Sequence, residues 1–416
     1  MNSKSSSMPY RLLIFLVLPI AAFAQSIRKI HIKEHFWIVL LFALFFSYTY
    51  IPLQGSDAMR YVDRFGSLNN YGFSQYLEDI KGMYDGSGFY QDAYVYTIQL
   101  VVSPFTSDIR VYRLVLGFVY FFTFLSLIKY LILNNLGQRT KFNWFILGIV
   151  FIISFTSGIN GIRWPLAFMV FLLGAYRYIT TSHKKYLFLA SLSLLIHFIF
   201  FLSVLIFLLF VLTRKYYKPK ITSLFVLVLF FFSNFFATQL TSNATVIGDG
   251  FEEKVVEYSE NESWKEQRTE GFNSMNWYVQ LQRTAPNTFV FFALIITTYF
   301  GLKLRKSDLV TSLQYLAFLS FFISFISAQL VDQNSNRFAI VATAVGLIYL
   351  YHLYNENPKN KVLNVLRKVY IPIAVLTILG NIRADLYTVS PNLVFGNVLT
   401  EMFYRFDESI QGLVGL

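Results

Sequence analysis

The sequence has no cysteine and few charged residues. None of its 416 residues is Cys, and Asp, Glu, Lys and Arg together make up 14% of the chain. Without cysteine the chain forms no disulfide, iron–sulfur cluster or thiolate metal site, and it has no Cys nucleophile. Soluble domains carry about 25% charged residues, so this chain has too few to cover a surface that faces water. The composition therefore excludes a soluble enzyme, a disordered chain and a nucleic-acid-binding protein.

Several signatures of nucleotide, metal and hydrolase chemistry are also missing. The sequence contains no Walker loop, no dinucleotide-binding glycine pattern, no His/Asp cluster with zinc spacing and no GxSxG nucleophile turn. These absences argue against an ATP-driven pump and against an enzyme that uses nucleotide sugars. We expect a function that needs neither a metal ion nor a cofactor.

Long apolar runs, in contrast, occur along the whole chain, and 55% of the residues are hydrophobic. A helix needs about 20 apolar residues to cross a bilayer. Runs near this length predict spans at residues 36–54, 112–132, 143–159, 164–181, 221–240, 286–302, 309–330, 338–355 and 369–384. We expect one all-α domain over residues 1–416, a polytopic membrane bundle of about 11–13 segments that include short or broken helices.

Two further apolar runs do not have the length of one span. Residues 12–24 fit either a short uncleaved first helix, which we favour, or a cleaved signal peptide. Residues 186–212 would form a helix about 40 Å long, which is more than one span needs. Lysines and arginines flank this second run on both sides, and basic flanks mark the cytoplasmic side. We therefore predict two short helices that turn near His197, with one long tilted helix as the alternative.

Positive charge divides the loops into two sides. With this turn, the loops assigned to the cytoplasm contain 20 basic and three acidic residues, a net charge of +17, whereas the outer segments contain 13 basic and 20 acidic residues, a net charge of −7. The positive-inside rule predicts such a distribution. The loops at 55–92 and 241–285 and the tail at 385–416 fall outside. We expect the protein to handle its substrate on the exoplasmic face.

Three arginines stand at the outer ends of predicted spans. Arg163 follows Asn160, Arg337 follows Asn336, and Arg383 lies at the end of the last span. Arginine is less expected on this side, and its planar donor group binds phosphate oxygens in pairs. We predict that the arginines bind a pyrophosphate and that the two asparagines contact the substrate. The alternative is that each arginine caps a helix or extends to the membrane interface.

Two other features carry groups that suit proton transfer and sugar binding. His197 is the one histidine predicted to lie away from the cytoplasm, and an imidazole can accept or donate a proton near neutral pH. In the segment at 55–65, Asp57 and Tyr61 share a helix face, with Arg60 beside it. We predict catalytic roles for His197 and Asp57 and substrate contacts for Arg60 and Tyr61. The alternatives are a buried neutral histidine and a local Asp–Arg pair on a surface helix.

These motifs, in this order, resemble those of the EpsG family and, more broadly, of Wzy-type bacterial polysaccharide polymerases. The resemblance covers about residues 36–384 and rests on Asp57…Tyr61…Phe65, Asn160-Gly-Ile-Arg163, His197 in a broken apolar run, and Asn336-Arg337-Phe338. Family members commonly have Gln after the first of these arginines, where this chain has Trp164. A role for that Gln therefore does not carry over.

The resemblance implies an enzyme of the bacterial inner membrane that polymerises polyprenyl-pyrophosphate-linked oligosaccharide units into an exopolysaccharide or O-antigen. It implies that Arg163 and Arg337, helped by Arg383, stabilise the departing pyrophosphate. His197, or else Asp57 or the substrate-contacting Asp332, would activate the acceptor hydroxyl. A flippase and a chain-length regulator would be its partners. The alternatives are a ligase for finished glycan and a flippase or transporter of the lipid-linked unit, although the sequence lacks the related halves common in transporters.

Overall fold

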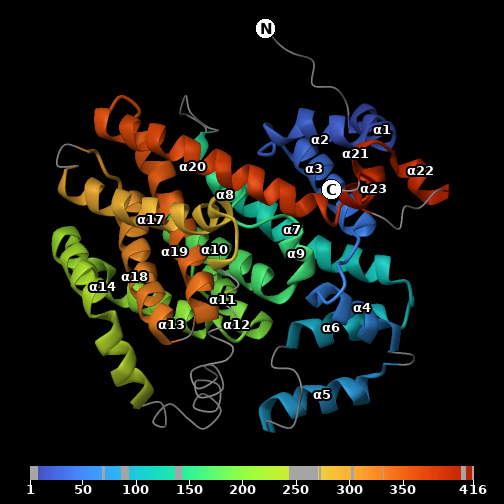
Figure 1. Cartoon of the computed structure of the whole chain (residues 1–416), viewed down its shortest axis with the longest axis horizontal. Helices are drawn as coiled ribbons and strands as arrows, with labels where there is room; N and C mark the ends of the chain where they lie inside the picture. Colours follow the sequence, from blue (N-terminus) through green and yellow to red (C-terminus); the bar gives the residue numbers. More distant parts are fainter. Residues whose placement is uncertain are drawn as a thin grey trace.

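The protein is built from α-helices joined by turns (Figure 1). The computed structural model describes residues 8–67, 71–85, 93–135, 143–242, 270, 273–300, 304–330, 332–403 and 409–414. Within these ranges no β-strand occurs, and a short 3₁₀ helix follows residue 213. The predicted all-α fold is therefore confirmed.

Four helices of the described ranges are long and apolar enough to cross a membrane: α7 (Ile109–Leu133), α18 (Asp308–Leu330), α19 (Asp332–Glu356) and α20 (Lys361–Leu386). Each overlaps a predicted span. Four more helices overlap predicted spans without meeting this measure, namely α3 (Lys33–Thr49), α10 (Arg163–Thr181), α14 (Pro219–Ser242) and α17 (Trp277–Tyr299). The long helices pack side by side, α18 against both α19 and α14, and α3 against α7.

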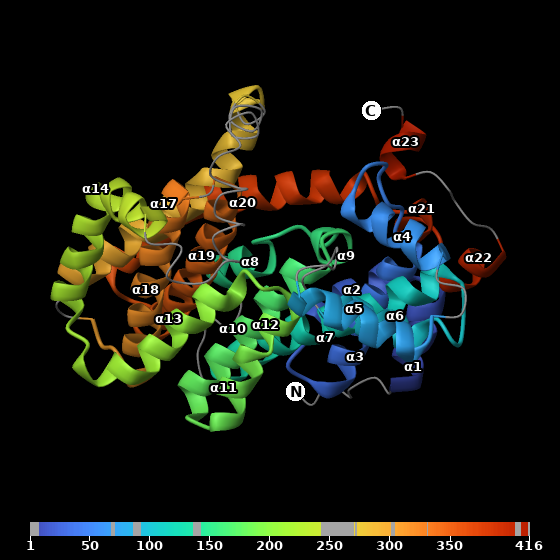
Figure 2. The same cartoon turned by 90° about the horizontal axis from the view of Figure 1, so that it is seen from below.

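One predicted span, residues 143–159, is not a single helix. It is divided into α8 (Trp144–Val150) and the single turn α9 (Ser157–Asn160), with a non-helical segment at 151–156 between them. Hydroxyl side chains interrupt the helix here, because Ser154 Oγ bonds the hydroxyls of Thr156 and Ser157 and accepts from the Ser157 N–H at 3.2 Å. Figure 2 shows α20 passing over this break.

The run at 186–212 forms the predicted pair of short segments. It contains α11 (Lys184–Ser191), α12 (Ser193–Ile196) and α13 (Phe200–Thr213). At one end of α10, Arg177 donates to the Tyr186 hydroxyl at 2.8 Å and Arg214 lies over the Tyr178 ring, so both basic flanks meet there. At the other end, the Trp164 and Phe200 rings are 6.5 Å apart. The chain therefore leaves along α11 and α12, turns at His197 and returns along α13.

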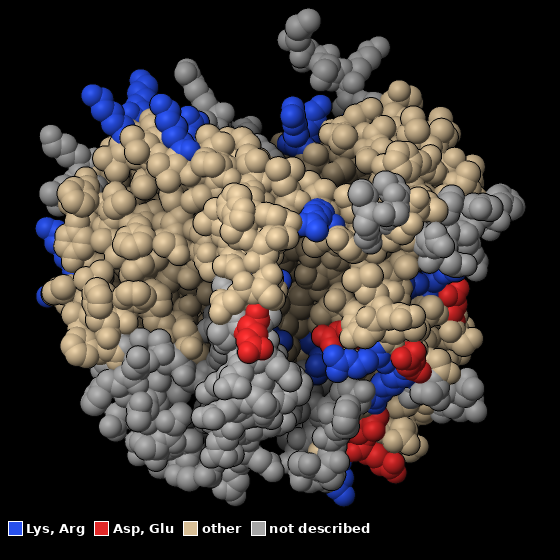
Figure 3. Space-filling view, viewed as in Figure 1, with Lys and Arg blue, Asp and Glu red and all other residues tan. Residues whose placement is uncertain are grey.

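A group of short helices lies beside α7 at the lower right of Figure 1: α4 (Asp57–Ser67), α5 (Phe73–Asp85) and α6 (Ala93–Val102). Arg64 of α4 pairs with Asp79 of α5 at 3.5 Å and lies 4.4 Å from the ring centroid of Tyr96 of α6. Figure 3 shows acidic and basic side chains mixed over this group, and mostly basic side chains along the upper edge over α2 and the start of α20.

The N-terminal run predicted as one short helix is in fact two, α1 (Met8–Val17) and α2 (Pro19–Ile27). Pro19 divides them because proline is accepted in a first helical turn but not in a helix interior. Both pack on α3, where the Phe23 and Phe42 rings stack 4.5 Å apart. The C-terminal helices α21 (Pro391–Val394), α22 (Val398–Phe403) and α23 (Ile410–Val414) lie at the same edge (Figure 1).

Because the sequence has no native cysteine, single cysteines can report the side of the membrane on which they lie. We predict that Lys185→Cys and Lys215→Cys, at exposed positions on either flank of the 186–212 run, are both protected from an impermeant maleimide in right-side-out vesicles and both labelled in inverted vesicles. Ser107→Cys, exposed just before α7, should show the reverse. Opposite labelling of the two lysine positions would contradict the hairpin.

Candidate functional site

The helix α4 is fastened to the turn that precedes α10. The Ala58 backbone N–H donates to Oδ1 of Asn160 at 3.0 Å, so a residue of α9 caps the first turn of α4. The rings of Tyr61 and Phe65 are buried in one apolar cluster with Ile162. The two hydrogen-bonded residues are 102 positions apart in the sequence. The motif around Asp57 and the motif around Asn160 therefore form one structural unit.

The turn before α10 contains a strained residue. Ile162 has φ 34° and ψ −61°, which is unusual for a β-branched side chain and costs roughly 1–3 kcal/mol. Its side chain is 3% exposed and packs in the cluster shared with α4. Burial of the Ile162 side chain therefore stabilises the strained turn. The helix α10 begins directly after this turn, with Arg163 as its first residue.

One face of α20 holds the break between α8 and α9. The Asp385 carboxylate accepts hydrogen bonds from the backbone N–H groups of Phe155 (3.3 Å) and Thr156 (3.0 Å) and from the Thr156 hydroxyl (2.8 Å). One turn earlier on α20, the Asn381 amide donates to the Phe151 carbonyl oxygen at 2.5 Å. Asp385 is buried. These bonds satisfy backbone groups that a broken helix would otherwise leave unpaired.

His197 lies at the turn between α12 and α13, in an extended backbone conformation with φ −155° and ψ 116°. Its Nδ1 accepts a hydrogen bond from the Ile199 backbone N–H at 3.3 Å. A neutral imidazole that accepts at Nδ1 carries its proton on Nε2, so the ring is a donor at Nε2 in this arrangement. The contact between Trp164 and Phe200 places His197 and Arg163 at the same end of α10.

Arg337 lies near the N-terminal end of α19. The next residue, Phe338, lines a small cavity together with Phe171 of α10 and residues of α13. The first part of α19 therefore lies against the middle of α10 and the first half of α13. Helix N-termini carry partial positive charge that favours anions. Three of the predicted residues, all half-buried, thus lie in the same half of the bundle: Arg163, His197 and Arg337.

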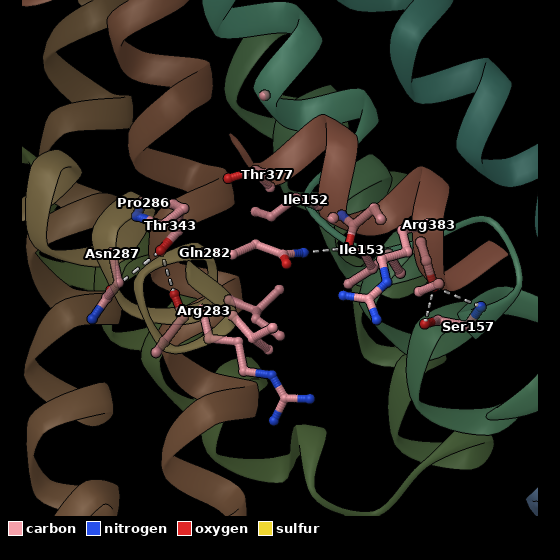
Figure 4. A pocket seen from close by; sticks show the side chains of 18 of the residues that line it. Ile152, Ile153, Ser157, Gln282, Arg283, Pro286, Asn287, Thr343, Thr377 and Arg383 are labelled. Carbon is pink, nitrogen blue, oxygen red and sulfur yellow. Dashed lines mark hydrogen bonds between the residues drawn. The ribbon is translucent and has the colours of Figure 1, made fainter. Parts of the chain in front are cut away.

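A pocket of about 600 Å³ opens between α8, α17, α19 and α20 (Figure 4). Arg283 of α17 and Arg383 of α20 both line it, and Arg383 Nη1 donates to the Tyr278 hydroxyl at 2.7 Å. The broken segment contributes Ser154 to the pocket wall and α9 contributes Ser157, while Asn160 of α9 contacts α4. The same short segment therefore separates the pocket from α4.

The predicted arginines fall into two groups. Arg383 lines this pocket, whereas Arg163, Arg337 and His197 are not among the described residues that line it. A group of three or more metal-ligating side chains is not found in the part of the chain that the structure describes.

The predicted residues of α4 differ in their surroundings. Asp57 and Arg60 form an ion pair with each other, and both side chains are exposed, which is the local surface pair that the sequence left as an alternative. Tyr61 is 6% exposed, and its ring packs against the protein rather than facing open space. The side chains of Asp332 and Asn336 lie outside the described residues, as does most of the acidic loop at 241–285.

The comparison with known protein families agrees with this arrangement. The sequence pattern of the EpsG family matches residues 38–388, which include every motif described above. The chain belongs to the EpsG family. No curated protein and no solved structure matches the chain.

Membership of the EpsG family confirms the predicted resemblance and gives the protein a general role. EpsG is a family of Wzy-type polysaccharide polymerases. Together with the apolar helices, the match identifies a multi-pass membrane protein that acts in polysaccharide polymerisation.

Two groups in this EpsG-family chain were not predicted as site residues. Arg283 falls in the predicted loop at 241–285, because the apolar run begins only at residue 286, whereas α17 begins at Trp277 and contains Pro286 in its interior. Asp385 was counted as the start of an exoplasmic tail, whereas it still belongs to α20. One sequence feature could have indicated the role of Asp385. Asn381 and Asp385 are four residues apart, which places both side chains on one face of a helix.

Asp385→Ala should lower the melting temperature of the detergent-purified protein by several degrees. The variant leaves three hydrogen-bond donors without their acceptor, and each unmet buried donor costs roughly 1–3 kcal/mol. Asp385→Asn keeps one carbonyl acceptor, so its melting temperature should lie between those of Asp385→Ala and the unmodified protein. Asp308→Ala, at an exposed aspartate in the first turn of α18, is the control. Equal melting of Asp385→Ala and the unmodified protein would contradict the anchoring role.

Proposed function

We propose that the protein is a glycosyltransferase that joins polyprenyl-pyrophosphate-linked oligosaccharide units into a surface polysaccharide at the exoplasmic face of the bacterial inner membrane. One observation carries the proposal. Arg163 and His197 lie at the same end of α10, and Phe338, the neighbour of Arg337, lies against the middle of α10 and the first half of α13. Guanidinium groups and helix N-termini in the same half of the bundle suit a pyrophosphate that gains negative charge as it leaves.

The reaction requires one bond to form and one to break. The acceptor hydroxyl oxygen attacks the anomeric carbon of the donor glycan, and the bond from that carbon to the pyrophosphate oxygen breaks with its electron pair on the pyrophosphate. Arg163 and Arg337 offset the charge that develops there. His197, a donor at Nε2, hydrogen-bonds the departing oxygen, and the acceptor proton passes to water.

The charge of the loops supports the outer face as the site of reaction. Arg163 and His197 lie at the end of α10 opposite the end where Arg177, Tyr186 and Arg214 meet. Basic loops mark that second end as cytoplasmic. A flippase would supply the substrate from the inside, and a chain-length regulator would act on the product outside.

Arg163→Ala and Arg337→Ala should each reduce polymer formation by about 100-fold or more, since the loss of one preorganised donor to a developing oxyanion has an effect of this size. The measurement is the length distribution of products made by purified protein reconstituted with lipid-linked repeat units. Arg305→Ala, at an exposed arginine before α18, is the matched control.

Normal long chains from both arginine variants would show that the pyrophosphate binds elsewhere. If the reconstituted protein moves lipid-linked units across the bilayer without lengthening them, it is a flippase. If it transfers finished glycan to another lipid, it is a ligase.

His197→Ala should slow polymerisation by at least about 100-fold, the lower range for loss of one hydrogen-bond donor to a developing oxyanion. His197→Gln, whose amide also donates a hydrogen bond, should keep more activity than His197→Ala. A neutral donor predicts a rate that does not rise between pH 6 and pH 8 in the unmodified protein. A rise with pH that disappears in His197→Ala would instead assign His197 as the general base.

A further inference from the structure

The pocket between α8, α17, α19 and α20 is separate from the residues to which the proposed function assigns chemistry. Its two cationic side chains stand on different helices, Arg283 on α17 and Arg383 on α20. In Figure 4 both guanidinium groups point toward the space between these helices. Arg383 is held by the Tyr278 hydroxyl, while no hydrogen bond or ion pair joins Arg283 to another residue of the described ranges. Two arginines that share one cavity favour a ligand with at least two anionic oxygens.

The walls of the pocket are held in place by polar contacts. Gln282 Nε2 donates to Asn381 Oδ1 at 3.1 Å, and Asn381 in turn binds the broken segment. On the opposite side, the Thr343 hydroxyl donates to Asn287 Oδ1 at 3.2 Å. Gly380 permits the close approach of α20 to α17, because a Cβ there would lie 1.9 Å from Gln282 Oε1. The cavity is therefore preformed rather than a gap between loosely packed helices.

The remaining lining groups suit a sugar. Side-chain amides and hydroxyls come from α17, α19, α20 and α9, namely Gln282, Asn287, Thr343, Thr377, Asn381 and Ser157. Such groups donate to and accept from sugar hydroxyls. The described lining contains no Asp or Glu to repel an anion and no His. The pocket has the chemistry to bind an anionic glycan without cleaving it.

We propose that this pocket holds the acceptor substrate by its pyrophosphate and its first sugar; this inference rests on the proposed polymerase function. Polymerisation requires two pyrophosphate-linked glycans at the same time. The donor loses its pyrophosphate, which requires charge stabilisation and a proton-bearing group, as at Arg163, Arg337 and His197. The acceptor keeps its pyrophosphate and reacts at its far end, so its anion must be bound at a distance and left unactivated.

The broken segment is the element that separates these two sites. Ser157 contributes to the pocket wall, and Arg163 begins α10 six residues later, after the turn at Ile162. An acceptor bound by its pyrophosphate in the pocket would extend its glycan along this segment toward the reacting centre. The distance between the two anion sites would then select the length of the repeat unit.

Binding stoichiometry tests the site without requiring turnover. Purified full-length protein should bind two equivalents of undecaprenyl pyrophosphate. The Arg283→Ala/Arg383→Ala double variant should bind one, Arg163→Ala should also bind one, and Arg305→Ala should bind two. Two equivalents bound by the double variant would overturn the proposal, whatever the reconstituted protein makes. Failure of the polymerase assay with loss of one equivalent in the double variant would instead overturn the proposed function, and with it the acceptor role, but would leave the pocket as a pyrophosphate-binding site.

Two-substrate kinetics test the assignment to the acceptor. With labelled lipid-linked dimer as donor and the lipid-linked single unit varied, Arg283→Ala and Arg383→Ala should each raise the acceptor KM about tenfold or more, because bonds to charged groups are lost. Their kcat should stay within about twofold of the unmodified value, whereas Arg163→Ala lowers kcat. Arg283→Lys and Arg383→Lys, which keep the charge but lose the paired donors, should show intermediate KM values.

Two results would overturn the assignment. One is an increase in the donor KM with an unchanged acceptor KM, which would make the pocket a donor site. The other is equal competition by a uronic-acid oligosaccharide that lacks pyrophosphate, which would show that the arginines recognise a sugar carboxylate.

Discussion

The contact between one face of α20 and the broken segment at 151–156 is the constraint on which the rest of the site depends. In a bilayer, every backbone polar group needs a partner within the protein, so a helix can be interrupted only where other groups supply those partners. Asn381 binds the carbonyl at the start of the break, and Asp385 binds the amides at its end. The buried carboxylate thereby allows non-helical chain at the depth where substrate chemistry is needed.

The consequences of this break extend in two directions. On one side, it ends in α9, where Asn160 caps α4, and in the strained residue Ile162, after which Arg163 opens α10. On the other side, Ser157 and its neighbours form part of a polar pocket with Arg283 and Arg383. Two groups of arginines thus flank one immobilised segment. Under the proposed function, this arrangement would keep the donor and acceptor pyrophosphates apart.

Much of the architecture could be predicted from local sequence patterns. The spans that became α7, α18, α19 and α20 follow from apolar runs of bilayer length, and the turn at His197 follows from basic residues on both flanks of a run too long for one span. The prediction was wrong at 143–159, where apolar composition favoured one helix but long-range hydrogen bonds support a break. It also placed the start of α17 too late, because packing accommodates Pro286 inside the helix.

The sequence by itself determined the class of protein, the position of its long apolar helices, and the candidate arginines near the starts of α10 and α19. These properties depend on hydrophobicity, charge and short-range spacing, which are local and periodic along the chain. Only the tertiary structure decided that Asn160 reaches α4, that Asp385 holds residues 155 and 156, and that Arg283 shares a pocket with Arg383. Single contacts between residues 100 or more positions apart leave no period in the sequence, because one side chain at one place is enough to make them.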